Sequence, residues 1–481
     1  MSGGGRISRL VRSGSCLLPA SRTRHGCSTA EHVHSTAEQA HSTAPAELQL
    51  RTEDVFRSRS VRDLLRAVAV YQVCAFDRIV DNSLQLLRLG EQLLGSRLLQ
   101  RLVSPFYRQF VAGSDRQQLE RTVTALRADG IRFMMTSMLE ADVGEQAASE
   151  EQLTANMEEA LRQMMLVRDI TSEEDQPAIQ TKFTAHMDVE LLVLASRVFS
   201  ASSEPTALVE RLAKAMVTSG QVIVPGMTRQ QQKQWDGAAL RLKTLGDACA
   251  QHNMSLFVDG EFTYTNPAIS WITLALMTAL NQHRAVVRGT YQCYLKATPS
   301  NLEQEYSITR QLGACFGAKL VRGAYMARER QLAQKEQRPS PVCESYEETT
   351  ANYTRAVEFA LRRVAEDEGR TQIMVATHNY DSIVHALRLS AMLQLTPASS
   401  GLSFGQIYGM ADYLTIPLAR SGHRAYKAVP FGEFSTVMPY LSRRAAESRL
   451  IQQGVRLERQ LLLKELAGRI SRRGRAREVV V

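Results

Sequence analysis

Apolar residues recur at two different spacings along this chain of 481 residues. From about Thr52 to Arg168 they return every three or four positions, and the clearest stretches, Val61–Leu87 and Leu119–Leu139, contain no proline. This spacing matches the turn of an α-helix and places the apolar side chains on one face. The pattern therefore predicts an all-helical region over residues 51–170.

From about Ala178 short β-type runs alternate with long amphipathic stretches. The runs predict seven strands: Ile179–Thr184, Ser255–Val258, Ala285–Tyr294, Ala318–Gly323, Gln372–Thr377, Gly401–Ile407 and Arg424–Val429. The stretches predict helices at Thr228–His252, Ala268–Gln282, Ser307–Phe316, Tyr346–Glu368 and Tyr380–Leu393. Strand–helix alternation implies a parallel sheet. An eighth strand, expected in Val189–Val198 or Gln221–Val224, would close it into a barrel.

An open, doubly wound sheet is the structural alternative. Such a sheet would normally carry a glycine-rich phosphate loop after its first strand, and the sequence contains no G-x-G-x-x-G motif. The fold class favoured for residues 171–455 is therefore α/β, as a (β/α)8 barrel of the TIM type preceded by the helical region.

Charge is concentrated at the two ends of the chain. The formal net charge is +9, but residues 1–30 contain five arginines and no acid, and residues 456–481 contain eight basic and three acidic side chains. The remaining residues sum to −1, whereas a nucleic-acid binder should carry its positive charge on a folded face. We therefore expect no nucleic-acid partner. The seven cysteines include no C-x-x-C pair, so neither a zinc site nor a disulfide framework is expected.

Residues 1–30 have the composition of a mitochondrial transit peptide, since arginines alternate with apolar residues at helical spacing in Arg6–Arg12. A disordered basic N-terminus is the alternative. Residues 31–50 continue a short repeat, STAEHVH then STAEQAH, and are expected to form a low-complexity spacer. In the basic tail over residues 456–481, leucines are interleaved with arginine and lysine. This tail is either a helix lying on a membrane surface or a solvated helix end.

Several predicted strands end in polar or charged residues, and in a barrel these ends gather in one mouth. They are Lys182, Asp259 with Glu261, Gln292, Lys319 with Arg322, and Thr377 with His378. Lysine and arginine are seldom buried without a partner, so these cations predict an anionic ligand in the mouth. Taken alone, each of these residues is more often structural, as a lysine that extends to solvent or a hydrogen-bonded histidine in the core. Their occurrence at five strand ends favours a site.

A further candidate is the pair Arg443-Arg444, which follows Tyr440 near the start of a helix after the Pro430-Phe-Gly432 turn. Two guanidinium groups can close on one carboxylate at a helix start, where backbone N–H groups also favour an anion. A pair of arginines is more often only a solvated face.

Taken in order, these segments resemble the motif series of the proline dehydrogenase family. The matching segments are Lys182-Phe-Thr, Val258-Asp-Gly-Glu, Thr290-Tyr-Gln-Cys-Tyr, Lys319-Leu-Val-Arg-Gly-Ala-Tyr325, Ala376-Thr-His-Asn379, Gly405-Gln-Ile-Tyr-Gly-Met410 and Tyr440-Leu-Ser-Arg-Arg. The resemblance covers about residues 50–455. It implies a distorted (β/α)8 barrel that binds FAD noncovalently, oxidises a cyclic imino acid and passes electrons to a membrane quinone.

The resemblance also implies roles for individual residues. Lys182, Arg443 and Arg444 would hold the substrate carboxylate, while Tyr440 and Ile407 would pack on the substrate ring and Asp259 would support the site. The residues implied in FAD binding are Gln292, Lys319 (near the flavin N5), Arg322, Gly323, Ala324, Thr377, His378 and Glu447. No metal is implied. Together with the arginine-rich leader, the family places the enzyme at the matrix side of the mitochondrial inner membrane, with ubiquinone as electron acceptor.

One position departs from the family pattern. Proline-oxidising members carry a tyrosine just before a Val-Pro-x-Gly turn, and here Ala428 stands in that place. The smaller side chain opens space for a 4-hydroxyl group, as in the family's hydroxyproline-specific branch. We therefore expect trans-4-hydroxy-L-proline as substrate, with 1-pyrroline-3-hydroxy-5-carboxylate as product. L-Proline is the alternative substrate if Phe431 or Tyr426 fills the space.

Two other functions are compatible with parts of the sequence. A metal-dependent barrel hydrolase would use His378, Asp259 and Glu261, and it would bind zinc or manganese without visible absorbance. A basic scaffold would bind nucleic acid or anionic lipid through residues 469–481, and its binding would depend strongly on salt. A visible spectrum distinguishes both from a flavoprotein.

Overall fold

The computed structural model describes residues 55–56, 59–136, 138, 148–218, 220–367, 369–397, 401–447 and 451–478. Within these ranges it describes only the backbone of residues 444, 446–447, 451–455 and 472–478. The predicted leader and spacer, residues 1–50, lie outside the described residues. All described residues belong to one compact unit, Glu47–Val481.

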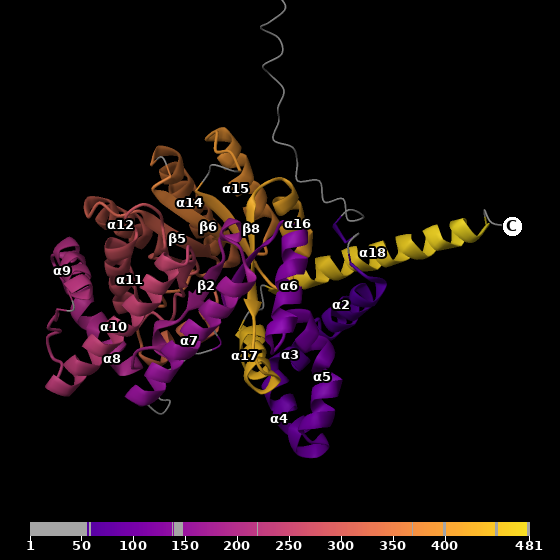
Figure 1. Cartoon of the computed structure of the whole chain (residues 1–481), viewed down its shortest axis with the longest axis horizontal. Coiled ribbons are helices and arrows are strands. Elements are labelled where there is room, and N and C mark those ends of the chain that lie inside the picture. The colour runs from indigo at the N-terminus through magenta and orange to yellow at the C-terminus, as the bar shows by residue number, and fades with distance from the viewer. Residues whose placement is uncertain are drawn as a thin grey trace, which may run out of the picture. The chain divides into compact units, whose positions relative to one another are not determined.

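Eight parallel strands pair in sequence order and close into a barrel (Figure 1). They are β1 (Arg132–Thr136), β2 (Ala178–Thr181), β3 (Ser255–Val258), β4 (Val287–Gln292), β5 (Phe316–Val321), β6 (Thr371–Ala376), β7 (Leu402–Ile407) and β8 (Arg424–Pro430). The barrel closes where β1 pairs with β8, with Arg132 opposite Tyr426 and Thr136 opposite Pro430. The predicted fold class, an α/β barrel with a helical region before it, is confirmed.

The position predicted for the eighth strand was wrong. That strand is β1, inside the region predicted to be all-helical, whereas Val189–Ser200 forms helix α8 and residues 221–224 form neither helix nor strand. Helix α6 (Arg116–Ala128) ends before Gly130, whose φ of 73° lies in the left-handed region that favours glycine. The run Phe133-Met-Met-Thr136 then pairs with both β2 and β8, so strand partners decided its conformation.

Helices surround the strands and cap one side of the barrel (Figure 1). Besides α6 and α8 they are α2 (Val61–Cys74), α3 (Asp77–Asp81), α4 (Ser83–Leu94), α5 (Ser96–Phe110), α7 (Glu150–Ile170), α9 (Pro205–Thr218), α10 (Arg229–Gln251), α11 (Asn266–Leu280), α12 (Thr298–Gln311), α13 (Met326–Lys335), α14 (Tyr346–Glu366), α15 (Tyr380–Met392), α16 (Asp412–Arg420), α17 (Phe434–Glu447) and α18 (Ile451–Glu478). Side-chain caps fix several starts, as where Thr228 accepts from the N–H of Gln231 in α10 and Asn379 accepts from Ser382 in α15.

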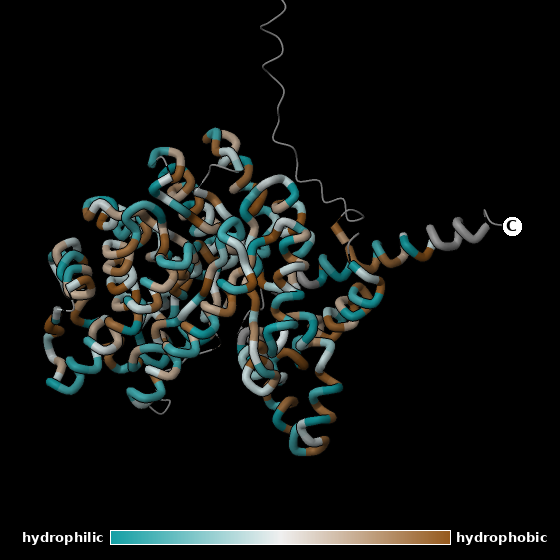
Figure 2. Tube along the Cα trace, viewed as in Figure 1, coloured by the Kyte–Doolittle hydropathy of each residue, from teal (hydrophilic) through white to brown (hydrophobic). Residues whose placement is uncertain are grey.

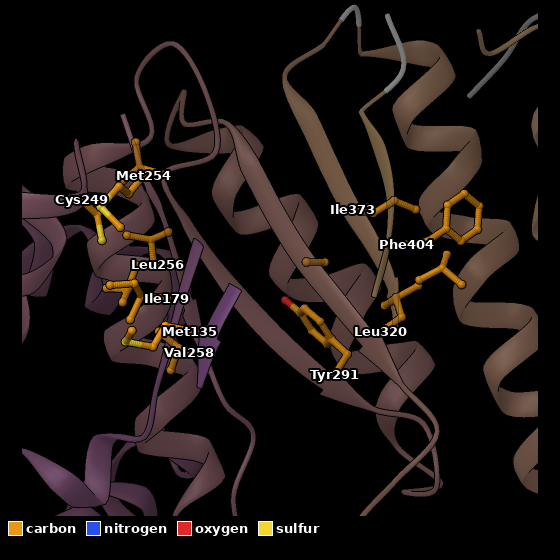
Figure 3. Close-up of a cluster of buried hydrophobic side chains, with 14 of the residues drawn as sticks. Met135, Ile179, Cys249, Met254, Leu256, Val258, Tyr291, Leu320, Ile373 and Phe404 are labelled. Atoms are coloured by element: carbon orange, nitrogen blue, oxygen red, sulfur yellow. The ribbon is translucent and has the colours of Figure 1, made fainter. Parts of the chain in front are cut away.

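Strand side chains alternate between two apolar layers. Outward-pointing residues such as Met135, Leu256 and Leu320 pack with the surrounding helices in the main core (Figure 3). Inward-pointing residues form a second, smaller cluster of Met134, Ala178, Phe257, Met374 and Tyr426. This inner cluster fills the lower part of the barrel, and the open space lies toward the carboxyl ends of the strands.

The C-terminal helix α18 packs against α2, and Leu462 and Leu466 are buried there. Arg469 donates to the carbonyls of Phe56 at 2.7 Å and Arg59 at 2.8 Å. The tail is therefore a helix docked on α2 over residues 456–471, with Leu463 and Ile470 still exposed on it. None of the described helices combines the length and the apolarity needed to cross a membrane.

Candidate active site

A cavity of about 470 Å3 opens where the barrel strands end. It is lined by most of the residues predicted for the site: Lys182, Asp259, Gln292, Lys319, Arg322, Gly323, Ala324, Thr377, His378, Ile407, Ala428 and Tyr440. Seven of the eight strands and helix α17 supply them, so tertiary structure gathers positions far apart in sequence. Arg443 is exposed on α17 and does not line the described cavity wall. The side chains of Arg444 and Glu447 lie outside the described part of the structure.

An ion pair forms one side of the cavity. The Nζ of Lys319 on β5 lies 2.5 Å from Oδ1 of Asp259, which directly follows β3. Lys319 is buried, and its Nζ lies 5.9 Å from the centre of the Phe257 ring in the inner cluster. Because Asp259 and Phe257 hold the ammonium group from two directions, its position in the cavity wall is fixed.

A second buried cation, Lys182, faces the aromatic ring of Tyr440. Its Nζ lies 5.3 Å from the ring centre, within the range of a cation–π contact. Beside it, Glu261 accepts hydrogen bonds from Thr184, 3.2 Å from the backbone N–H and 2.7 Å from the hydroxyl. Burial raises the pKa of Glu261 to about 7, although the hydrogen bonds and the charge of Lys182 act in the opposite direction.

The amide of Gln292 is oriented by its neighbours. Asn266 donates to its oxygen at 2.8 Å, and the amide nitrogen donates to the carbonyl of Gly260 at 3.2 Å. A Cβ on Gly260 would lie 2.8 Å from the amide carbon of Gln292, so a larger residue at this position would displace the amide from its present place.

Arg322 presents positive charge at a different part of the cavity. Its guanidinium donates to Thr350 at 2.6 Å and Ser382 at 3.3 Å, and it lies 4.8 Å from the ring centre of Tyr346. Among the described residues no carboxylate forms an ion pair with it. Helices α13 and α15 begin close by, and the residues before them line the cavity. An arginine beside two helix starts suits an anionic group such as a phosphate.

His378 links the ends of β6 and β7. The backbone N–H of Ile407 donates to its Nε2 at 3.0 Å, so the proton of the neutral ring is on Nδ1. Burial and the positive charge of Lys427 lower the pKa of His378 to about 3. The ring is therefore neutral at physiological pH, and it holds Ile407 in place rather than carrying charge.

Four buried or half-buried charged residues lie behind this wall, and we name them the wall cluster. Lys427 Nζ lies 2.9 Å and Arg59 Nη2 lies 2.8 Å from the two carboxylate oxygens of Asp412. Glu458 of α18 accepts from the backbone N–H groups of Ala411 at 2.6 Å and Asp412 at 2.9 Å. Burial and the charge of Asp412 raise the pKa of Glu458 to about 7, while Lys427 and Arg59 outweigh burial and lower that of Asp412.

Further residues that were not predicted for the site line the cavity, and three of them show why they were missed. Tyr346 begins α14 after a long loop, Leu457 belongs to the tail, and Thr136 ends the strand that was not predicted. Only Thr136 had a usable signal, because the glycine after α6 marks a helix end that would have separated β1 from the helical region.

A family model described as "Proline dehydrogenase" matches residues 119–456. The chain belongs to the proline dehydrogenase family. Hydroxyproline dehydrogenase of Xenopus laevis is 33% identical over 429 residues, covering 89% of this chain and 91% of that protein. Hydroxyproline dehydrogenase of Homo sapiens is 32% identical over 424 residues, 86% of this chain and 92% of that protein. The predicted resemblance is thereby confirmed, and the chain is an oxidoreductase of the proline/hydroxyproline dehydrogenase type.

Other family members are more distant. Proline dehydrogenase 1, mitochondrial, of Homo sapiens is 28% identical over 533 residues, 87% of this chain and 89% of that protein. Among solved structures, proline utilization A from Bdellovibrio bacteriovorus aligns with a TM-score of 0.59 and 15% identity over 83% of this chain. Only 38% of that longer protein is covered, and the likeness shows the barrel fold.

The three residues expected to bind metal in a hydrolase each form another interaction in the structure. Asp259 pairs with Lys319, Glu261 accepts from Thr184, and His378 accepts from Ile407. In the part of the chain that the structure describes, no group of three or more His, Cys, Asp or Glu side chains is placed to hold a metal ion. The geometry therefore does not favour the hydrolase.

Proposed function

We propose that this chain oxidises trans-4-hydroxy-L-proline to 1-pyrroline-3-hydroxy-5-carboxylate, with FAD as cofactor and ubiquinone as electron acceptor. The observation that carries the proposal is the arrangement of cations around a single cavity. Lys182 lies against Tyr440, Lys319 is paired with Asp259, and Arg322 lies near two helix starts. One cavity thus offers separate positions for a substrate carboxylate and for the phosphates of a dinucleotide.

The residues present fit FAD. Arg322 with Gly323 and Ala324, and Thr377 with His378, would hold its phosphates and ribityl chain, while Lys319 and Gln292 would contact the ring system. Bound FAD would accept the hydride that leaves the substrate carbon next to the ring nitrogen. Glu447 would contact the cofactor as the resemblance implies, and this role stays a prediction.

The protein's own contribution to the reaction is to orient the imino acid. Lys182 would hold the carboxylate, and the ring of Tyr440 and the side chain of Ile407 would cover the substrate ring. The carbon to be oxidised would then face the cofactor. Arg443 and Arg444 would complete the carboxylate site, as the resemblance implies. The substrate nitrogen must lose its proton before hydride leaves, so activity should rise with pH up to the pKa of that amine.

Ala428 supports hydroxyproline as the substrate. It lines the cavity on β8 and lies opposite Ile407 of β7 in the strand register, so the two side chains share one part of the wall. A tyrosine at this position would project its ring into that space. The curated relatives at 32–33% identity are named hydroxyproline dehydrogenases, while those named proline dehydrogenase are 26–28% identical.

The cellular setting completes the proposal. The arginine-rich residues 1–30 and the relatives named as mitochondrial support import into mitochondria. Ubiquinone resides in the membrane, so we infer peripheral attachment at the matrix side of the inner membrane.

Absorption spectroscopy tests the proposal directly. The purified full chain should be yellow, and anaerobic trans-4-hydroxy-L-proline should bleach the flavin band at lower concentration than L-proline does. Equal efficiency of the two imino acids would overturn the preference for hydroxyproline, and reversed efficiency would assign L-proline as the substrate. A protein that stays colourless after incubation with FAD, or whose flavin band neither imino acid bleaches, would overturn the enzymatic proposal itself.

Arg444→Ala provides a second test, with Arg443→Ala beside it. Loss of a carboxylate contact made in the ground state should raise KM for the imino acid while flavin absorbance is retained. If KM is unchanged in Arg444→Ala, that residue does not bind the substrate.

A further inference from the structure

Exposed apolar side chains gather in one short part of the chain. More than half of the large apolar side chains that are exposed in the described residues lie between Val61 and Leu102. The most exposed of these is Leu93, with 74% of its surface accessible, and Leu94 and Leu98 are 45% and 46% exposed. Contiguous exposed apolar side chains usually mark an interaction surface.

These three leucines surround the turn between α4 and α5, and we name them the hairpin tip. Gly95 ends α4 and begins α5 with a φ of 72°, which turns the chain back on itself. Figure 2 shows hydrophobic residues in brown along this hairpin. The contact between α4 and α5 is made elsewhere, where Leu99 of α5 lies next to Gly90 of α4. No residue of α4 is buried, so the leucines of the tip are not part of this contact.

The charge around the hairpin tip is positive. Residues 82–110 contain four arginines, all of them exposed, against the single acid Glu91, which leaves a surplus of three positive charges. A second copy of this chain placed on the same face would bring like charges together. An anionic bilayer surface instead offers phosphate groups to the arginines and an apolar layer to the leucines.

We propose that the hairpin tip inserts into the interface of an anionic phospholipid bilayer. Leu93, Leu94 and Leu98 would reach the acyl boundary, and Arg97 and Arg101 would contact headgroup phosphates. This inference rests on the membrane attachment in the proposed function and assigns its surface. The tail is a poorer candidate because Leu462 and Leu466 are buried against α2. Its exposed residues Leu457, Leu463 and Ile470 are six and seven positions apart instead of grouped around one turn. Helix α4 packs against α17, which carries Tyr440, so the attachment lies on the side of the helix that covers the cavity.

Sedimentation of the full chain with vesicles tests this surface. Vesicles of phosphatidylcholine with an anionic phospholipid should bind the protein, and vesicles of phosphatidylcholine alone should bind it much more weakly. The double variant Leu93→Glu/Leu98→Glu should bind anionic vesicles at least about tenfold more weakly, because two apolar side chains become charged. Arg97→Gln/Arg101→Gln should lose much of the salt-sensitive part of the binding. Leu240→Glu, at a leucine of α10 that is 60% exposed, is the matched control and should bind normally.

Turnover with a soluble electron acceptor separates this proposal from the proposed function. All these variants should match the wild type in that assay and in far-ultraviolet circular dichroism, since none of the changed residues lines the cavity. A wild type that binds vesicles without oxidising either imino acid would overturn the proposed function alone. Unchanged vesicle binding by both double variants would overturn the assignment of the hairpin tip as the membrane-binding surface. So would a lipid-free dimer that Leu93→Glu/Leu98→Glu dissociates, since it would assign the surface to a second copy.

Discussion

Replacing Glu458 with alanine should loosen the C-terminal helix and the cavity wall together. Its carboxyl group accepts from the N–H groups of Ala411 and Asp412 at 2.6 and 2.9 Å, at the start of α16. Each buried N–H left without an acceptor costs about 1–3 kcal/mol. Allowing for partial relaxation and water entry, we expect the free energy of unfolding to fall by about 3 kcal/mol. Glu458→Gln keeps one acceptor oxygen and should lose about half as much.

The change should also reach the substrate site. The start of α16 is tied to β7 and β8 through Lys427, which pairs with Asp412 and donates to the carbonyls of Met410 and Ile407. Ile407 lines the cavity, so freeing Asp412 should displace this wall and raise KM for the imino acid severalfold, with a smaller change in kcat.

Urea denaturation followed by circular dichroism measures the first effect, and steady-state kinetics with a soluble acceptor measures the second. Gln460→Ala is the matched control, because this exposed residue lies on the same helix. If the free energy of unfolding of Glu458→Ala is within about 0.5 kcal/mol of that of Gln460→Ala, the two backbone contacts do not hold the helix. If stability falls while KM stays at the wild-type value, the wall cluster does not position Ile407.

Three further outcomes are expected. Ala428→Tyr should shift the ratio of kcat/KM toward L-proline by about tenfold or more, since the new ring would occupy the space for a 4-hydroxyl; an unchanged ratio would place that hydroxyl elsewhere. Asp259→Asn should lower the free energy of unfolding by about 1–3 kcal/mol, because it leaves the buried Lys319 ammonium beside a neutral amide, and a thermal transition equal to wild type would contradict this. Burial and then the charge of Arg241 lower the pKa of His186 from 6.5 to about 4, so its contribution to stability is present above pH 6.5 and is lost as pH falls toward 4. At pH 5 this loss is about 2 kcal/mol, and His186→Gln should show a weaker decline between pH 7.5 and 5 in urea titrations.

Seven of the eight strands and several helices of the barrel were predictable because their patterns are local, although the helix predicted at Ser307–Phe316 lies at Thr298–Gln311 and Phe316 begins β5. Helices α10, α14 and α15 begin at capping residues that the sequence displays, and the predicted ranges match them closely. β1 was not predictable in this way. Its apolar run Phe133-Met-Met fits either a helix or a strand, and pairing with β2 and β8 selected the strand.

The candidate site shows the same division. Lys182, Asp259 and Lys319 were identifiable because charged residues on apolar strands are unusual in any fold. The ion pair between Lys319 and Asp259, by contrast, joins positions on two different strands, and no spacing rule foresees its 2.5 Å contact. Tyr346 and Leu457 carry no signal, since an aromatic residue at a helix start and a leucine in a tail are ordinary.

The basic tail marks most clearly what the sequence determined and what only the tertiary structure decided. Sequence alone fixed its helical character and its excess of arginine and lysine, because both follow from local composition. It did not fix which face of the helix meets water. Leu462 and Leu466 became buried because α2 offers them an apolar surface, and Glu458 is held inside because α16 presents two unpaired N–H groups. Those partners are distant in sequence, so the environment of the tail depends on the folded chain as a whole.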